Sequence, residues 1–124
     1  MTGGSQLTPT DPAPGYEVFH TDCPARDMLS HATSRWGIWV LISLQNQNLR
    51  FFELREAIEG VSEKMLAQSL RALVDDGLLW RHVEPTTPPQ VTYGLTPFGK
   101  DLSTPLTDLL DRITRHLPTP TPGP

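Results

Sequence analysis

The chain has 124 residues, of which 37% are hydrophobic and 19% charged, enough for one small domain with a modest core. The formal net charge of −4 runs against the basic footprint expected of a nucleic-acid-binding protein, and the single cysteine, Cys23, excludes an intrachain disulfide framework or an all-cysteine metal site. The N-terminus has no signal-peptide pattern and the longest apolar run, 38–44, is too short to span a bilayer, so we expect a cytoplasmic protein with no membrane partner.

The N-terminal third predicts an arm followed by two helices. Residues 1–21 are rich in proline, glycine and threonine and lack an apolar period, which predicts a disordered or loosely docked arm. A first helix should begin near Pro24, because proline suits a first helical position. A second helix, capped by Thr33 or Ser34, is predicted to be the buried central helix because it is apolar nearly all round. Its apolar residues are Trp36, Ile38, Trp39, Val40, Leu41, Ile42 and Leu44.

The segment 51–96 carries the most informative pattern of the chain. After a strand of one or two residues within 49–51, a third helix over about 52–58 should bury Leu54, Ala57 and Ile58. Gly60 stands where a helix C-cap favours a left-handed residue, and Ser62 suits the N-cap of a fourth helix. Two helices across a tight glycine-containing turn predict a helix-turn-helix.

The fourth helix and the residues after it predict a wing. The apolar residues that follow helical spacing and should face inward are Met65, Leu66, Leu70, Leu73 and Val74. Gly77 should end this helix, and strands over 78–84 and 91–95 are joined by a loop of proline and polar residues. A hairpin directly after the second helix of a helix-turn-helix is typical of proteins that place that helix in the DNA major groove.

A last helix should follow Thr96 and Pro97, with Pro105 either kinking it or marking its real start. Its apolar stripe consists of Leu102, Leu106, Leu109, Leu110, Ile113 and Leu117. A long stripe at the edge of a small domain needs a partner surface, most simply the same helix of a second subunit, which predicts a homodimer. Residues 118–124 should form a Pro-rich disordered tail, which leaves 22–117 as the domain.

The chain resembles the HxlR family of bacterial transcriptional regulators, winged-helix proteins related in fold to MarR, over roughly residues 23–115. The matching residues are Cys23-Pro24, Trp36 with 40–44, Arg50-Phe51, Glu53-Leu54-Arg55, Gly60-Val61-Ser62, Lys64-Met65-Leu66, Leu70-Arg71, Leu73, Asp76-Gly77-Leu78, Arg81, Pro88-Pro89, Tyr93, Leu95-Thr96-Pro97 and Gly99. The resemblance implies a mostly α winged helix-turn-helix with a small β-hairpin. It also implies a homodimer, held by the N- and C-terminal helices, that binds operator DNA. Three positions depart from the family pattern: Gln90 replaces an arginine of the wing, Thr92 a carboxylate, and Phe52 a small residue.

The candidate DNA-binding residues lie mainly on the outer face of the fourth helix. Lys64, Gln68 and Arg71 share that face, with Ser62 at its start. Arginine suits bidentate contact to guanine, glutamine suits adenine, and serine at a helix start suits phosphate. The alternative is an ordinary solvated face.

Further candidates lie on the wing and before the helix-turn-helix. On the wing, Arg81, Thr87 and Gln90 are candidates for tracking phosphates or a minor groove, although a wing that only supports the fold is the alternative. Arg50 and Arg55 are candidates for contacting the DNA backbone. For these two arginines, surface ion pairs with Glu53 or Glu59 are equally open.

Cys23 precedes a helix N-terminus, where the helix dipole can lower a thiol pKa. Some HxlR-like proteins use a cysteine at this position to sense oxidants or electrophiles; the alternative is a packed or capping cysteine. The histidines show no metal-ligand spacing, and no phosphate loop or Ser/His/Asp set appears, so no metal, cofactor or catalytic residue is predicted. A small effector, if the protein uses one, should bind in the dimer groove.

These patterns predict a transcription factor that binds a pseudo-palindromic operator as a homodimer. The alternative is a winged-helix protein-interaction module without DNA binding, which the acidity and the missing wing arginine keep open. Most of the excess acidic charge lies outside the predicted DNA-binding segment, because residues 48–100 hold six basic and seven acidic side chains. The net charge therefore counts less against DNA binding.

Overall fold

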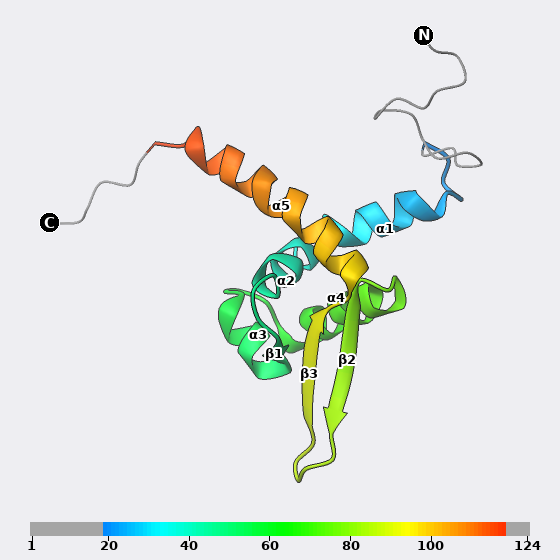
Figure 1. Cartoon of the computed structure of the whole chain (residues 1–124), viewed down its shortest axis with the longest axis vertical. Helices are drawn as coiled ribbons and strands as arrows, with labels where there is room; N and C mark the ends of the chain where they lie inside the picture. Colours follow the sequence, from blue (N-terminus) through cyan, green and yellow to red (C-terminus); the bar gives the residue numbers. More distant parts are fainter. Residues whose placement is uncertain (1–18, 119–124) are drawn as a thin grey trace, which may run out of the picture.

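The computed structural model describes residues 19–118, so most of the predicted arm and tail lies outside the described residues. The described residues fold into helices and one small sheet (Figure 1). The elements are α1 (Pro24–Ala32), α2 (Gly37–Ser43), β1 (Leu49–Arg50), α3 (Phe51–Ala57), α4 (Glu63–Asp75), β2 (Leu79–Glu84), β3 (Gln90–Leu95) and α5 (Pro97–Arg115). This order is the winged helix-turn-helix predicted from the sequence. Among the described helices, none is long and apolar enough to cross a bilayer.

The core is formed mainly by leucines of α2, α3 and α4 and of the turn after α4. The largest side chains with almost no exposed surface are Leu41, Leu54, Leu66, Leu70, Leu73 and Leu78. Burying each one removes a full aliphatic side chain from water, which stabilises the fold by about 1.5–3 kcal/mol per residue. Leu78 lies just beyond α4, where its amide donates to the Leu73 carbonyl at 3.0 Å. The apolar period of α4 and this turn therefore hold α4 on the domain.

Helix α2 is central but is less buried than predicted. It contacts α1, α3, α4 and α5, and Val40 and Leu41 are fully buried. Trp39, however, is 40% exposed, because one side of α2 remains uncovered in a single chain. The helix also begins at Gly37, later than the predicted cap implies, although the Ser34 hydroxyl still accepts a hydrogen bond from the Gly37 amide at 3.1 Å. A Cβ at Gly37 would collide with the His31 carbonyl oxygen, so the α1–α2 connection needs glycine there.

Ser62 caps α4 as predicted, whereas the C-cap of α3 is Ile58 and Gly60 lies in the turn beyond it. Gly60 has φ +89°, the left-handed conformation that glycine adopts readily. The Ser62 hydroxyl oxygen accepts a hydrogen bond from the Met65 amide at 3.1 Å, and Glu53 Oε1 accepts one from the Arg50 amide at 2.8 Å. Two predictions of burial are wrong: Ala57 is exposed, and Met65 is 41% exposed.

Both errors of burial have the same cause. Each residue lies beside the buried face of its helix: Leu54 is the buried residue of α3, with Ile58 following at the C-cap, and Met65 lies on the flank of α4 rather than over the core.

The sheet has the order β1-β3-β2, and both pairs are antiparallel. The register pairs Leu49 with Tyr93 and Leu79 with Leu95, which turns the buried side chains of the sheet toward the helices. The remaining length of β2 and β3 projects from the domain as the wing (Figure 1). The sequence located this hairpin to within one residue at either end.

Helix α5 is continuous through Pro105, so this proline does not mark its start. The Thr96 hydroxyl oxygen caps the helix by accepting a hydrogen bond from the Gly99 amide at 3.0 Å. The apolar stripe divides into two parts. Leu102 and Leu106 pack against the core, whereas Leu109 and Ile113 are 48% and 51% exposed on the part that extends away from the domain (Figure 1). Leu117 lies beyond the helix end and is also exposed.

Candidate nucleic-acid interface

Helix α4 presents a polar face to solvent because its buried leucines point the other way. Leu66, Leu70 and Leu73 are buried, and the opposite face carries Lys64, Gln68, Arg71 and Asp75, all exposed. These four positions follow a spacing of four, three and four, so they line one side of the helix. The structure therefore places the predicted candidates of the fourth helix on one continuous outer face. Ser62 lies at the start of that face, where its oxygen already caps the Met65 amide and its hydroxyl hydrogen is available to donate.

A polar groove of about 380 Å³ separates α4 from the sheet. Arg71 and Asp75 line it from α4, and Arg81 lines it from β2, opposite Tyr93 on β3. The groove thus brings together two arginines that are ten residues apart in the sequence. Arg81 therefore lies beside α4 rather than on the distal wing.

The remaining wing candidates lie apart from this groove, in the loop of the hairpin and at the last strand pair beside that loop. Thr87 is exposed in the β2–β3 loop, and Gln90 is half-buried and pairs with Glu84 at the first position of β3. The neighbouring Thr86 hydroxyl donates to the Pro88 carbonyl at 2.8 Å, which uses its hydrogen within the loop. Thr87 and Gln90 are therefore placed to meet DNA only where the wing reaches it.

The two arginines around α3 differ in their surroundings. Arg50 is exposed just before the helix, and its backbone amide is bound by Glu53. Arg55 Nη1 lies 3.4 Å from Glu63 Oε2, which links α3 to the first turn of α4. The ion-pair alternative for Arg55 is thus present, although its partner is Glu63 and not Glu53 or Glu59. An exposed pair of this kind contributes at most about 1 kcal/mol to stability.

A second groove, of about 650 Å³, runs along the other flank of α4. Its walls are the α1–α2 connection, with Ser34, Arg35 and Trp36, and the side of α4 that carries Met65 and Gln68. The guanidinium carbon of Arg35 lies 4.8 Å from the centroid of the Trp36 ring. Trp36 is predicted from the sequence to be a core residue, and Arg35 is not among the predicted site residues. The available signal was a basic residue placed directly before an apolar helix.

A contact between distant parts of the sequence anchors the far end of α4. His31 Nδ1, on α1, lies 2.6 Å from Asp76 Oδ2, at the C-cap of α4. The two residues are 45 positions apart, and no local pattern connects them. The contact joins α1 to the C-terminal end of α4.

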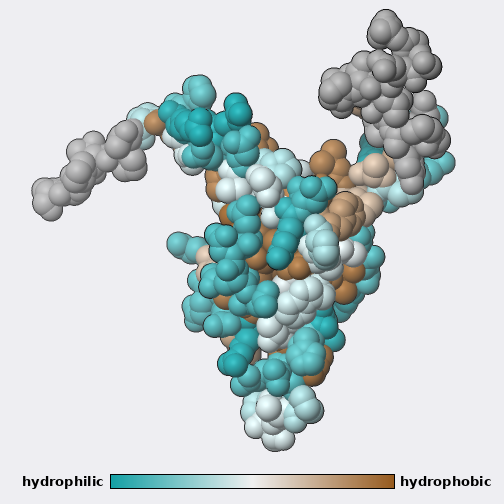
Figure 2. All heavy atoms as spheres, in the orientation of Figure 1, coloured by the Kyte–Doolittle hydropathy of each residue, from teal (hydrophilic) through white to brown (hydrophobic). Residues whose placement is uncertain are grey.

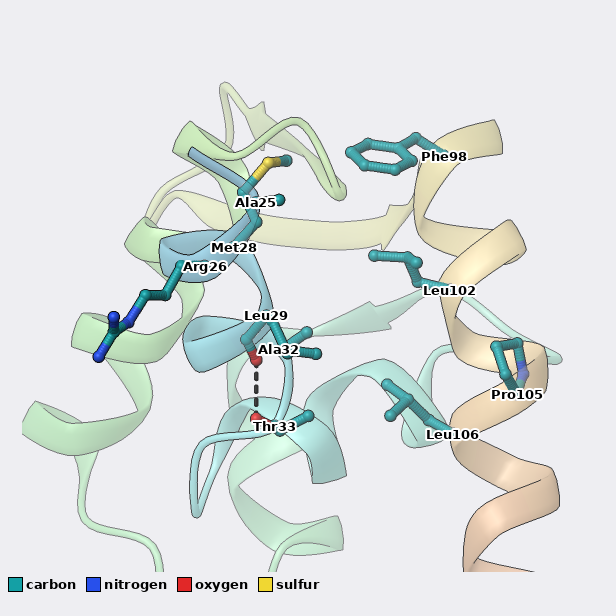
Figure 3. A pocket seen from close by; sticks show the side chains of 10 residues that line it. All are labelled: Ala25, Arg26, Met28, Leu29, Ala32, Thr33, Phe98, Leu102, Pro105 and Leu106. Carbon is teal, nitrogen blue, oxygen red and sulfur yellow. Dashed lines mark hydrogen bonds between the residues drawn. The ribbon is translucent and has the colours of Figure 1, made fainter. Parts of the chain in front are cut away.

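An apolar groove of about 510 Å³ lies between α1 and the first half of α5. Figure 3 shows Met28 and Ala32 of α1 on one wall and Phe98, Leu102 and Leu106 of α5 on the other. Figure 2 shows apolar surface where α1 approaches α5, whereas this face of distal α5 is mostly hydrophilic. The groove is an uncovered apolar surface on the two helices predicted to dimerise.

Cys23 immediately precedes α1 and is only 5% exposed, so its thiol does not face solvent in the single chain. This burial fits the packed-cysteine alternative better than an accessible sensor. Within residues 19–118, no group of three or more histidine, cysteine or carboxylate side chains is arranged to hold a metal ion.

Comparison with known proteins places these features in a family. A model described as HxlR-like helix-turn-helix matches residues 32–120. Over 101 residues the chain is 50% identical to YtfH of Escherichia coli K12, described as an uncharacterized HTH-type transcriptional regulator; the match covers 82% of this chain and 80% of that protein.

Solved structures agree with this match. A structure of ytfH from Salmonella typhimurium, described as a transcriptional regulator, superposes with a TM-score of 0.78 at 48% identity, covering 83% of this chain and 92% of that chain. The redox regulator HypR in its oxidized form superposes with a TM-score of 0.70 at 27% identity, covering 78% of this chain and 100% of that chain. The relatives are thus regulators of transcription, and redox regulation is stated of HypR.

Proposed function

Because this chain belongs to the HxlR-like helix-turn-helix family of transcriptional regulators, we propose that it binds duplex DNA as a homodimer at a pseudo-palindromic operator. The observation that carries the proposal is the exposed face of α4, where Lys64, Gln68 and Arg71 stand in one row. A helix of about 10–12 Å diameter fits a major groove about 12 Å wide, so this row would face the base edges. Arg81 and Arg50, on either side of the helix-turn-helix, would contact phosphates.

The proposed dimer rests on apolar surface that a single chain leaves uncovered. The α1–α5 groove and the exposed Leu109 and Ile113 lie on the same two helices. A second copy related by a two-fold axis would cover both regions with equivalent surfaces. It would also present two recognition helices to half-sites about one helical turn apart, which is the reason for expecting a pseudo-palindromic operator.

The competing function is a protein-interaction module that does not bind DNA. The net charge of −4 and the glutamine at position 90 favour it. The face of α4 favours DNA, because it carries two cations and one carboxylate, Asp75, and offers no exposed apolar patch for a protein partner. The two functions differ most clearly in the salt dependence of binding, which is steep for phosphate contacts.

Selection of duplexes from a random pool, followed by genome-wide mapping of bound sites, tests the proposed function. We expect one enriched sequence with two-fold symmetry, and binding that weakens steeply as salt rises. Failure to enrich any sequence, together with salt-insensitive capture of a protein, would favour the interaction module.

Two routes of regulation remain predictions within this function. One is a small apolar effector bound between α1 and α5, where the groove volume suits a ligand of that class. The other is modification of Cys23, which requires an opening that exposes the buried thiol. A chromosomal regulator of this kind would act in the bacterial cytoplasm.

A further inference from the structure

We propose that Arg35 binds a DNA phosphate on the flank of α4 opposite the wing. This inference rests on the DNA binding proposed above and adds to it a residue outside the helix-turn-helix and the wing. It assigns the groove beside the α1–α2 connection to one of the two DNA strands.

A helix of about 10–12 Å diameter fills a groove of about 12 Å, so a sugar–phosphate strand runs along each of its flanks. Helix α4 has a groove on either flank, one toward the sheet and one toward the α1–α2 connection. Each groove is therefore the place where one phosphate backbone passes.

The two grooves are lined by different cations. Arg71 and Arg81 supply the cations on the flank toward the sheet. On the other flank, Arg35 is the lining residue whose side chain is always charged. The other basic lining residue, His31, has its Nδ1 2.6 Å from Asp76 Oδ2. A DNA strand on this flank would meet the Arg35 guanidinium.

The Trp36 ring holds the Arg35 guanidinium in place. Its guanidinium carbon lies 4.8 Å from the centroid of the Trp36 ring. Trp36 packs against the core and reaches the turn of the helix-turn-helix, where a Cβ at Gly60 would lie 3.8 Å from Trp36 Cη2. The stack directs the charge to the turn and restricts its motion, so less side-chain entropy is lost when a phosphate binds.

Carboxylates within ion-pair distance would compete with a phosphate for an arginine. Arg55, Arg112 and Arg115 each lie within ion-pair distance of a carboxylate. Within residues 19–118 no carboxylate is within that distance of Arg35, whose side chain is exposed. The stacked guanidinium therefore keeps its hydrogen-bond donors for a ligand, and its planar fork matches phosphate oxygens.

The test compares Arg35→Ala with Arg112→Ala on the full chain. Both variants lose one positive charge, but Arg112 pairs with Asp108 on α5, remote from the recognition helix in sequence and in fold. The probes are the duplex selected by the wild-type protein and a scrambled duplex of the same length. Binding is measured by fluorescence anisotropy across a range of salt concentrations.

We expect Arg35→Ala to weaken binding to both duplexes by about tenfold and to reduce the slope of log affinity against log salt by roughly 0.9 per lost contact. Arg35→Lys, which keeps the charge, should restore that slope. Arg112→Ala should leave affinity and slope unchanged.

Wild-type affinity and slope for Arg35→Ala, with loss of binding for Arg71→Ala, would overturn the role of Arg35 while leaving the proposed function intact. Equal losses for Arg35→Ala and Arg112→Ala would reduce the effect to net charge and also overturn it. A wild-type protein that binds neither duplex would overturn the proposed function itself.

Discussion

Helices α4 and α5 both expose polar faces, but each leaves a different kind of surface without a partner. On α4 the main apolar residues are buried, and the exposed Lys64 and Arg71 have no carboxylate of residues 19–118 within ion-pair distance. On α5 the exposed arginines are paired within the helix, Arg112 with Asp108 and Arg115 with Asp111, while Leu109 and Ile113 face solvent.

The contrast indicates which partner each helix requires. Uncompensated positive charge favours a polyanion, whereas uncovered apolar area with neutralised charge favours a protein surface. The same residue type, arginine, is thus without an ion-pair partner of residues 19–118 on one helix and paired on the other. Four measurements would break or sharpen this division.

The largest effect is expected from Leu109→Asp on α5. A two-fold axis places the new carboxylate in the interface twice, and burying a charge without a partner costs several kcal/mol, so dimer affinity should fall by at least about a thousandfold. Sedimentation velocity at micromolar concentration should give a dimer for the wild type and a monomer for the variant. Thr104→Asp adds the same charge on the opposite side of α5 and should remain dimeric. A monomeric wild type at that concentration would remove the homodimer from the proposal.

The second effect concerns the outer face of α4. Changing Lys64, Gln68 and Arg71 together to alanine should lower operator affinity by about a hundredfold or more, since Arg71 alone should contribute roughly 1–3 kcal/mol. The melting temperature should hardly change, because all three side chains are exposed. Gel-shift titration and thermal unfolding measure the two quantities. Unchanged operator affinity in this variant would transfer support to the protein-interaction alternative.

A smaller effect is expected at the contact between α1 and the end of α4. Replacing His31 by alanine removes one partner of the half-buried Asp76 and should lower the free energy of unfolding by about 1 kcal/mol. A double-mutant cycle with Asp76→Ala in urea should give a coupling energy of similar size. A cycle that closes to zero would mean that the 2.6 Å contact contributes nothing to holding α4.

The smallest effect is expected at Cys23. The residue is only 5% exposed, so diamide or a quinone should change operator affinity little, and Cys23→Ser should respond as the wild type does. A strong response of the wild type that is absent in the serine variant would contradict this expectation. It would mean that α1 opens to expose the thiol and that the dimer surface, rather than α4, carries the signal.

The sequence by itself determined most of the elements and the exposed polar face of α4. Helical periodicity, the caps at Ser62 and Thr96 and the left-handed Gly60 are local features, formed by residues three or four positions apart, so they can be read before any tertiary contact is known. The outer row of α4 follows from the same period, because the positions of Leu66, Leu70 and Leu73 define the opposite side.

Only the tertiary structure decided what lies on the flanks of these helices. The exposure of Trp39 and Met65, the choice of Glu63 as the partner of Arg55, and the placement of Arg35 beside the turn all depend on how elements cross. The contact of His31 with Asp76 spans 45 residues, a separation at which no periodic pattern operates. The packing of α1 and α2 against α4 decides which side chains lie beside α4. The sequence therefore predicted the exposed polar face of α4, and the tertiary structure decided which residues lie beside it.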